Sequence, residues 1–528
     1  MYALFKRTNR ITYLREFEES KWQPLKVQEK VLYRILQKNK KTKYGIEHNF
    51  SKIKTIEEFR KQVQINSYEN LKPYIELIKK GEQNILTKDK VLFFAVSSGT
   101  TSAQKYIPIT KERTKIFKRE LMLWSKNILD KNFRGVSKGK TLYFAAAEYL
   151  GETESKIPYG NITGYHVKHL PWFIKKKVVL NVATHNIKDV DRRTKRIAEK
   201  ALAEKNISQL AFAAPIEILL FLKYIQENKT ELIKLVKKTN SKRGKELEEL
   251  DEENNFEPKY IWPNIKLISC IKAKINDEYL KELYKELGQE IPTRDPGIYA
   301  SEGRINLGLV KEDNAGVLVA NTNFFEFEEQ TTNGFEKPIT IEKIEQGKKY
   351  KVLITTPEGL YRYDIGDIIE VIGFKRKLPI VKYADRDNYI NIVGENLSEI
   401  ALLNAIHSII KKEKLELRGF TAAPYMPNGK EKPRYELMVE SKKEISKEQA
   451  KRILEILEEE LKEHGKTYYK ARNEFGRLDA PLLSILVEGS YDELDKERIS
   501  RSGQAKPMNI SKDPEFRKRF KIIKTYTI

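Results

Sequence analysis

Hydroxyl side chains, a glycine and a lysine gather in one short stretch of the chain, Ser97-Ser98-Gly99-Thr100-Thr101-Ser102-Ala103-Gln104-Lys105. This stretch follows the apolar run Val91–Val96, which predicts a buried strand, and precedes a second short extended segment, Tyr106–Thr110. Glycine lets backbone N–H groups approach an anion closely, the hydroxyls add donors, and lysine adds a positive charge. The pattern predicts a phosphate-binding loop. A Ser/Thr-rich surface turn is the alternative that this stretch alone leaves open.

Two further motifs combine aromatic, hydroxyl and acidic residues. In Tyr299-Ala300-Ser301-Glu302-Gly303, a ring could stack on a base, a hydroxyl could bind a phosphate or ribose, and a carboxylate could bind Mg²⁺. In the segment 359–367, Asp367 follows Gly366 beside a predicted strand at 368–372, where its carboxylate could accept both hydroxyls of a ribose. Taken singly, each motif could be an ordinary polar turn.

Two segments nearer the carboxyl end carry basic residues. Tyr383-Ala384-Asp385-Arg386-Asp387 precedes Gly394-Glu395-Asn396, and Ser502-Gly503-Gln504-Ala505-Lys506-Pro507 places a lysine in a glycine-containing loop. Such a lysine could reach a reacting carboxyl or phosphate group. By contrast, Gly135-Val136-Ser137-Lys138-Gly139-Lys140-Thr141 is similar to a Walker loop but runs into a predicted strand instead of a helix, so we interpret it as a basic turn.

Taken in this order, the five segments resemble the luciferase-like acyl-adenylating superfamily. More closely, they resemble the auxin-responsive Gretchen Hagen family of acyl acid amido synthetases. Trp262-Pro263, Phe324-Phe325-Glu326-Phe327 and Tyr469-Lys470-Ala471-Arg472 extend the resemblance over nearly the whole chain, apart from a charged stretch after Lys237.

The resemblance implies an α/β fold with two domains. It implies a large multi-layer N-terminal adenylating domain, residues 1–392, which binds ATP and the acyl group, and a small mobile α+β C-terminal domain, residues 393–528. It also implies ATP and Mg²⁺ as cofactors, with a carboxylic acid and an amine, an amino acid, as substrates.

The resemblance assigns a role to each site residue. Glu302 is implied as the Mg²⁺ ligand and a catalytic residue, and Lys506 as the catalytic lysine that supports adenylation. Asn396 departs from the plant enzymes, which often carry lysine there. The implied nucleotide-binding residues are Ser97, Ser98, Thr100, Thr101 and Lys105 at the phosphates, Tyr299 and Ser301 at the adenosine, Asp367 at the ribose, and Tyr383 and Arg386.

The implied reaction is a two-step ligation in which a carboxylate attacks ATP to give acyl-AMP, and an amine then displaces AMP. Transfer to a thiol, as in an acyl-CoA or carrier-protein ligase, is the nearest alternative. A nucleic-acid-binding protein is a more distant one, prompted by the formal net charge of +24. Lysine and glutamate are interleaved almost everywhere, which favours a solvated surface over a nucleic-acid site.

The elements expected to position these motifs alternate along the chain. Helices are predicted over residues 22–37, 55–63, 68–80, 111–129, 191–205, 216–237 and 277–287, and strands over 91–96, 141–146, 210–212, 265–268, 317–320 and 351–355. This alternation predicts α/β layers with substantial parallel pairing. The segment 237–258 is expected to be a charged segment that is exposed at the surface. Residues 143–148, 160–165 and 211–219 are predicted to line the acyl site.

The last third of the chain predicts a separate α-β-β-α-β unit. Its predicted helices cover 398–412 and a segment opened by Ser446, with Gln449 placed for a capping box, and its strands cover 415–422, 434–440 and 482–487.

Composition limits the remaining possibilities. The 528 residues exceed one ordinary core, and a single cysteine, Cys270, excludes a disulfide framework within the chain. The amino terminus does not have the form of a signal peptide, and the longest apolar stretch is too short for a bilayer. We therefore expect a cytoplasmic protein, a monomer, with no membrane or nucleic-acid partner.

Overall fold

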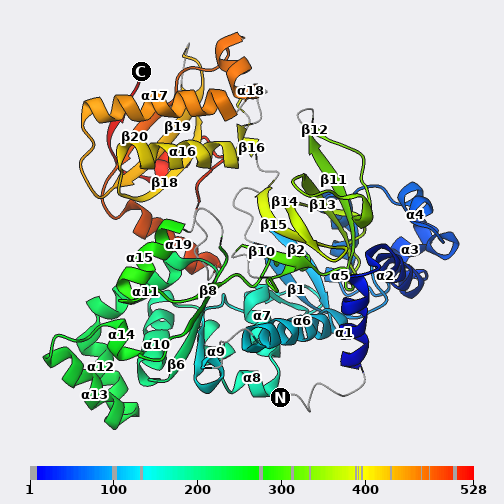
Figure 1. Ribbon diagram of the computed structural model, residues 1–528, viewed down its shortest axis with the longest axis horizontal. Helices are drawn as coiled ribbons and strands as arrows, with labels where there is room; N and C mark the ends of the chain where they lie inside the picture. Colours follow the sequence, from blue (N-terminus) through cyan, green and yellow to red (C-terminus); the bar gives the residue numbers. More distant parts are fainter. Residues whose placement is uncertain are drawn as a thin grey trace. The chain divides into compact units, whose positions relative to one another are not determined.

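The computed structural model describes residues 9–97, 104–130, 135–272, 277–310, 314–331, 334–386, 389–390, 392–393, 397–427, 431–464, 466–474, 476–502 and 508–528. The chain separates into two compact units between Ala384 and Asp385 (Figure 1). We call the described residues up to 384 the N-unit and those from 385 to 501 and 508 to 528 the C-unit. The domain boundary predicted at 392/393 stays a prediction. Within the described ranges, no helix is long and apolar enough to cross a membrane.

The N-unit begins with a helical layer and then alternates helices with strands. Local signals explain several helix starts: Thr55 Oγ1 accepts a hydrogen bond from Glu58 N (3.1 Å) while the Glu58 carboxylate accepts from Thr55 N (3.3 Å), a complete capping box. The helices are α1 Asn9–Ser20, α2 Pro24–Asn39, α3 Lys43–Glu47, η2 Phe50–Lys52, α4 Ile56–Gln62, α5 Tyr68–Lys79, α6 Lys111–Asp130, η3 Val136–Lys138, α7 Ile162–His169, α8 Trp172–Lys175, α9 Val182–His185, α10 Val190–Ala203, α11 Pro215–Glu227, α12 Lys229–Thr239, α13 Ser241–Glu252, α14 Pro258–Ile261, α15 Asp277–Glu286 and η5 Ile341–Lys343.

Three sheets form the β-structure of the N-unit. Their strands are β1 Val91–Ser97, β2 Lys105–Thr110, β3 Lys140–Tyr143, β4 Gly151–Glu152, β5 Pro158–Gly160, β6 Ile207–Ala211, β7 Leu267–Ser269, β8 Thr293–Arg294, β9 Asn306–Leu307, β10 Ala315–Leu318, β11 Phe324–Thr331, β12 Gly334–Phe335, β13 Lys349–Thr355, β14 Tyr363–Lys375 and β15 Leu378–Arg386. The strand orders are β2-β1-β5-β4, β12-β11-β13-β14-β15-β10-β9 and β3-β6-β7-β8.

Fewer strands pair in parallel than the sequence predicted. The sheet β3-β6-β7-β8 is parallel throughout, and β1 pairs parallel with β5. The seven-stranded sheet instead pairs antiparallel at β9–β10, β10–β15, β11–β12, β11–β13 and β13–β14. Residues 356–362 join β13 to β14 without an intervening helix, a connection short enough for antiparallel pairing, whereas the helix η5 lies between β12 and β13.

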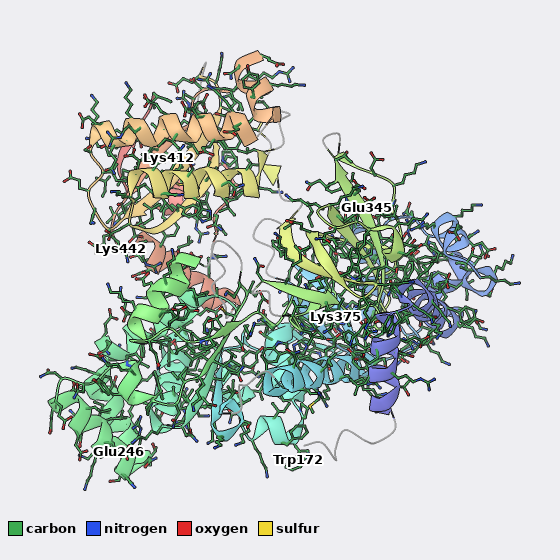
Figure 2. The ribbon with its side chains drawn as sticks, in the orientation of Figure 1. Trp172, Glu246, Glu345, Lys375, Lys412 and Lys442 are labelled. Carbon is green, nitrogen blue, oxygen red and sulfur yellow. The ribbon has the colours of Figure 1, made fainter. Side chains whose placement is uncertain are left out.

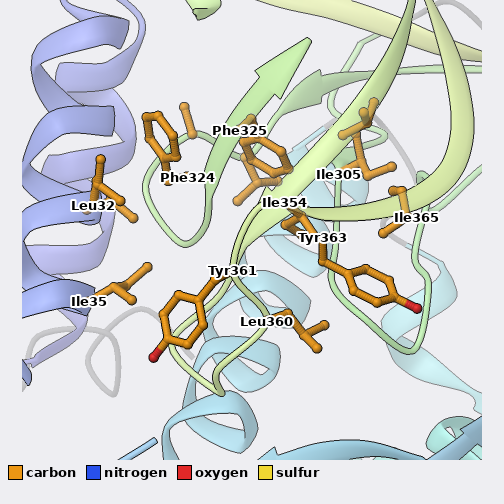
Figure 3. Packing of buried hydrophobic residues seen from close by; sticks show 14 of the residues in the cluster. Leu32, Ile35, Ile305, Phe324, Phe325, Ile354, Leu360, Tyr361, Tyr363 and Ile365 are labelled. Atoms are coloured by element: carbon orange, nitrogen blue, oxygen red, sulfur yellow. The ribbon is translucent and has the colours of Figure 1, made fainter. Parts of the chain in front are cut away.

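A large hydrophobic core joins the helical layer to the seven-stranded sheet. Leu32 and Ile35 of α2 are almost fully buried and lie opposite Phe324 of β11 and Tyr361, which precedes β14 (Figure 3). A separate core fills the space between the parallel sheet and helices α10 to α15. The first core also includes Phe93 and Phe94 of β1 and Ile107 of β2, so it joins two of the three sheets, whereas the second core contains the parallel sheet.

Two predictions about the segment 216–258 are wrong. The single helix predicted over 216–237 is interrupted at Asn228, whose side-chain amide donates to Tyr224 O (2.9 Å), giving α11 and α12. The charged segment forms the helix α13, which packs antiparallel against α12. Arg243 is buried and donates to the carbonyl oxygens of Leu202 (3.0 Å) and Ile261 (2.7 Å).

The C-unit combines a mixed four-stranded sheet with two long helices. The predicted α-β-β-α-β order is present as α16, β18, β19, α17 and β20, and β19 pairs parallel with β20. Ser446 Oγ accepts from Gln449 N (3.2 Å) at the start of α17, which is one half of the predicted capping box, but the Gln449 side chain donates to Glu413 O (3.3 Å). The elements are β16 Tyr389–Ile390, β17 Leu397–Ser398, α16 Glu399–Glu413, β18 Leu417–Tyr425, β19 Arg434–Ser441, α17 Lys447–His464, α18 Lys466–Tyr469, η6 Lys470–Glu474, β20 Leu482–Leu486, α19 Ser490–Ser502, η7 Phe516–Arg519 and β21 Ile522–Tyr526.

Candidate functional site

The predicted phosphate loop is closed at its base by the β1–β2 hairpin. Ser97, the last residue of β1, pairs with Lys105, the first residue of β2. Tyr106 N donates to the Tyr68 hydroxyl (2.9 Å), and Lys105 Nζ lies 5.8 Å from the centre of the Tyr68 ring. These contacts attach the hairpin end to α5 and hold Lys105 at the base of the loop. Ser98, Thr100 and Thr101 lie outside the described residues.

Tyr299 to Arg304 form a tight reverse turn at the end of the parallel sheet. Ala300 and Gly303 exchange backbone hydrogen bonds (3.0 and 3.2 Å), and Tyr299 bridges Arg304. A Cβ at Gly303 would lie 2.6 Å from Ile354 Cδ1, so a larger residue there would require the end of the Ile354 side chain to move. The turn follows β8, and ligand sites in parallel sheets lie beyond the carboxyl ends of the strands.

Glu302 is held half-buried at the centre of this turn. Among the described residues, none gives its carboxylate a hydrogen bond or an ion pair, and no cluster of three His, Cys, Asp or Glu side chains could bind a metal. Ser301 beside it is likewise half-buried. A single accessible carboxylate suits Mg²⁺ that takes its other ligands from phosphates and water.

Tyr299 is enclosed by a buried polar cluster that the sequence motifs did not identify. Its hydroxyl makes a 2.9 Å hydrogen bond with His166 Nε2, and His166 stacks on Phe117 of α6 with ring centres 3.6 Å apart. The guanidinium carbons of Arg304 and Arg113 lie 4.5 and 5.2 Å from the centre of the Tyr299 ring. Because its hydroxyl is engaged, a nucleotide contact from Tyr299 would come from its ring or backbone.

Burial sets the protonation of this cluster. It lowers the pKa of His166 well below its usual value, and the positive charges of Arg113 and Arg304 add to the effect. Burial also raises the pKa of Tyr299, while Arg113 opposes that rise. Both side chains are therefore neutral near pH 7, and the Tyr299–His166 hydrogen bond joins two neutral groups.

A buried ion pair fixes the far side of the turn. Arg304 Nε donates to Glu120 Oε2 of α6 (3.1 Å), and Arg304 Nη1 donates to Pro296 O (3.0 Å). Glu120 is fully buried and Arg304 nearly so. The two residues are 184 positions apart, so the sequence offered no local signal for their pairing.

The predicted acyl-site segments reach the same end of the parallel sheet. Tyr143 ends β3 and Ala211 ends β6, and these two residues pair in register. Burial raises the pKa of Tyr143 to about 12, with Glu217 of α11 and Tyr299 contributing in the same direction. Tyr143 and Glu217, which belong to two of the predicted acyl-site segments, are therefore near enough to interact electrostatically, and Tyr143 also with Tyr299. The acyl assignment itself stays a prediction.

The motif at 359–367 contains two buried structural residues and the proposed ribose ligand. Tyr361 and Arg362 are buried structural residues: the Tyr361 hydroxyl donates to Leu86 O (2.6 Å), and Arg362 donates to both Glu326 oxygens (2.8 and 3.1 Å). The sequence predicted that Asp367 precedes a strand at 368–372. In the structure, Asp367 lies within the strand β14.

A bulge determines how Asp367 is presented. Lys351 pairs with Ile368 and Leu353 pairs with Asp364, so β14 carries extra residues there. Gly366 at the bulge has φ +74°, and its N–H donates to Asp364 Oδ1 (2.8 Å). Bulges of this kind re-aim a side chain, here the buried Asp367.

Of the remaining predicted residues, Tyr383 belongs to the N-unit, Arg386 belongs to the C-unit, and two others lie outside the described part. Tyr383 of β15 is exposed, and Arg386 is the last residue of that strand. Lys506 and Asn396 lie outside the described residues. The Walker-like segment forms the short helix η3 followed by β3, which confirms the prediction of a turn rather than a phosphate loop.

Comparisons with known proteins agree with this arrangement. Indole-3-acetic acid-amido synthetase GH3.2 of Arabidopsis thaliana is 25% identical over 444 residues, covering 75% of this chain and 80% of that protein. Jasmonoyl--L-amino acid synthetase JAR4 of Nicotiana attenuata is 22% identical over 535 residues, covering 91% and 89%.

Solved structures match over a similar extent. AtGH3.15 acyl acid amido synthetase in complex with 2,4-DB has a TM-score of 0.84 at 20% identity, covering 98% of this chain and 97% of that one. 2-Hydroxyisobutyryl-CoA ligase with 2-HIB-AMP, in the postadenylation state, has a TM-score of 0.52 at 10% identity, covering 93% and 89%. These likenesses show the fold.

Three family models follow one another along the chain. The GH3 family N-terminal domain matches residues 13–293, the central domain 316–386 and the C-terminal domain 401–515. The chain therefore belongs to the GH3 family.

Proposed function

We propose that this protein is an ATP-dependent ligase that activates a carboxylic acid as acyl-AMP and transfers the acyl group to an amino acid, forming an amide. Membership of the GH3 family is the observation that carries this proposal. Support comes from the relatives named amido synthetases, from the solved ligase that holds an acyl-AMP, and from the Tyr299–Glu302 turn at the end of the parallel sheet.

In the first step, a carboxylate oxygen of the acid attacks the α-phosphorus of ATP and pyrophosphate leaves. Negative charge develops on the phosphate oxygens, so nearby donors and cations stabilise the transition state. We assign this role to Ser97, Ser98, Thr100, Thr101 and Lys105 of the loop and to Lys506 of the C-terminal segment. Tyr299, Ser301, Asp367, Tyr383 and Arg386 are assigned to the adenosine and ribose.

The residues present fit a magnesium ion, because Glu302 offers a carboxylate that no described residue pairs. Bound Mg²⁺ would neutralise charge on the ATP phosphates. In the second step, the neutral amine attacks the acyl carbon, the C–N bond forms, AMP leaves with the electron pair of the broken C–O bond, and the nitrogen releases one proton to solvent. AMP is a good leaving group, so this step needs no serine or cysteine nucleophile. We propose the cytoplasm as the place of this reaction, because ATP and free amino acids are available there.

Carboxylate-dependent exchange of labelled pyrophosphate into ATP, across a broad panel of acids, tests the first step. Exchange with at least one acid is expected, and its absence across the panel would refute the proposal. Release of AMP that depends on an amino acid supports amide formation. Release that depends on coenzyme A instead would assign the chain to the acyl-CoA ligases.

A further inference from the structure

His166 connects helix α7 to the turn that carries Glu302. Its side chain is 6% exposed, and Nε2 makes a 2.9 Å hydrogen bond with the Tyr299 hydroxyl at the start of the turn. The imidazole stacks on Phe117 of α6, with ring centres 3.6 Å apart and an angle of 3° between the ring planes. Satisfied hydrogen bonds inside a protein rigidify the groups that they join, so this contact can orient the turn.

Other contacts hold α7 in place without the turn. The Tyr165 and Thr114 hydroxyls form a 2.9 Å hydrogen bond, which ties α7 to α6. The Tyr165 ring also stacks on Phe93 of β1, with ring centres 4.6 Å apart. Because neither contact involves the turn, the position of α7 does not depend on the hydrogen bond between His166 and Tyr299. Breaking that hydrogen bond therefore releases the turn and leaves the helix attached.

Helix α6 also holds the other end of the turn. Arg304 closes the turn, bridges Tyr299 and donates to Glu120 Oε2 (3.1 Å). Glu120 and Phe117 lie three positions apart, so they share one face of α6. These contacts hold Tyr299 and Arg304, and Glu302 lies between the two held ends. The direction of the Glu302 carboxylate therefore depends on both of them.

We propose that His166 is a positioning residue, which through Tyr299 holds the turn in the form that directs the Glu302 carboxylate toward Mg²⁺ and ATP. The inference rests on the proposed function, which assigns Mg²⁺ binding to Glu302. The role needs a hydrogen-bonding group at the place of Nε2 and includes no proton transfer. This need distinguishes His166 from a histidine that only fills space beside Phe117.

Two substitutions separate the hydrogen bond from the ring. His166→Phe can stack on Phe117 but has no hydrogen-bonding atom, whereas His166→Gln offers an amide near the place of Nε2 and has no ring. We expect backbone amides of the turn 299–304, followed by hydrogen exchange and mass spectrometry without ligands, to exchange about 2- to 12-fold faster in His166→Phe, the factor for one lost hydrogen bond. His166→Gln should stay close to wild type. His48→Phe is the matched control, because His48 stacks on Tyr44 of α3 (3.8 Å) and not beside the turn.

Nucleotide binding gives a second measurement. In calorimetric titration with MgATP, the Kd of His166→Phe should rise by the same factor. In pyrophosphate exchange, its KM for ATP should rise while its KM for the acid stays unchanged, whereas general damage to the fold would change both. Tyr299→Phe removes the other half of the same hydrogen bond, so it should reproduce these effects and replaces His166→Phe if that variant does not fold.

Equal exchange of the turn in wild type and His166→Phe would overturn the proposal. An effect of His166→Gln as large as that of His166→Phe would also overturn it, because the ring would then be the important part. Faster exchange throughout the N-unit would make His166 purely structural. If wild type binds MgATP but exchanges no pyrophosphate with any acid, the proposed function fails, and the exchange of the turn and the MgATP affinities still decide the role of His166. If wild type does not bind MgATP, both proposals fail.

Discussion

The Glu120–Arg304 pair shows how a single buried contact can hold the turn to which we assign Mg²⁺ binding through Glu302. Glu120 projects from α6, and Arg304 closes the turn that carries Glu302. Removing one partner of a buried ion pair leaves an uncompensated charge, which costs about 3–5 kcal/mol. We expect Glu120→Ala to lower the free energy of unfolding by about this amount in denaturant titration.

An exposed pair provides the comparison for that measurement. Lys30 and Glu19 pair at 2.7 Å on the surface, so Glu19→Ala should cost less than about 1 kcal/mol. Equal losses of unfolding free energy in the two variants would show that burial does not make the Glu120 pair more important than an exposed pair.

His185 makes stability depend on pH. It ends α9 and is almost fully buried, and burial lowers its pKa to about 4, with Arg193 adding to the effect. Between about pH 6.5 and 4 the unfolded chain binds a proton that the folded chain does not, so stability falls as the pH falls. The loss attributable to His185 is on the order of 3 kcal/mol.

The difference between wild type and His185→Phe isolates this contribution from that of other titrating groups. Unfolding free energies measured from pH 7 to pH 4 should show the variant losing less stability than wild type on acidification. Parallel curves for the two proteins would show that His185 does not titrate in this way.

At the scale of elements, periodicity and caps predicted many of the longer helices and several strands, but not α1, α13 or α19. The helix predicted at 68–80 is α5, Tyr68–Lys79, and the strand predicted at 91–96 is β1, Val91–Ser97. The errors share a cause. The charged stretch 241–252 has few apolar residues, and its Arg243 is buried through hydrogen bonds to carbonyl oxygens of α10 and α14, which are distant in the sequence. Contacts between residues that are distant in the sequence, such as Glu120 and Arg304, produce no periodic pattern in the sequence.

The α12–α13 hairpin depends on one close backbone approach. A Cβ at Gly244 would lie 2.4 Å from Lys237 Cα, so Gly244→Ala must push the two helices apart. Overpacking costs about 1–3 kcal/mol, against a gain in helix propensity of about 1 kcal/mol. We expect a net fall in the free energy of unfolding, measured by chemical denaturation.

Gly373 in β14 is the control for that substitution. A Cβ there would meet no atom within 4 Å, and its backbone does not need glycine, so Gly373→Ala should leave stability nearly unchanged. A more stable Gly244→Ala protein would mean that the hairpin relaxes at no cost.

At the scale of the whole molecule, basic side chains are interspersed with acidic ones, and several pair with them. Lys412 pairs with Glu460 (3.2 Å), Lys348 with Glu345 (3.0 Å) and Lys205 with Glu246 (3.2 Å). The labelled charged residues are spread over both units (Figure 2). Exposed pairs of this kind contribute little stability but break up any continuous basic surface. The net charge of +24 therefore gives little support to a nucleic-acid-binding function.

The two proposed catalytic residues, Glu302 and Lys506, belong to different parts of the chain. Glu302 belongs to the N-unit, whereas Lys506 follows α19 near the carboxyl end of the chain. If Lys506 stabilises the charge that develops on the α-phosphate, it acts in the transition state more than in ATP binding. Lys506→Ala should then slow carboxylate-dependent pyrophosphate exchange by about 10²- to 10³-fold while the Kd for ATP stays within a few fold. Lys443→Ala, which removes a surface lysine paired with Glu416, controls for the loss of one positive charge from the C-unit. An exchange rate equal to that of the control would remove Lys506 from the mechanism, and a matching loss of ATP affinity would make it a binding residue instead.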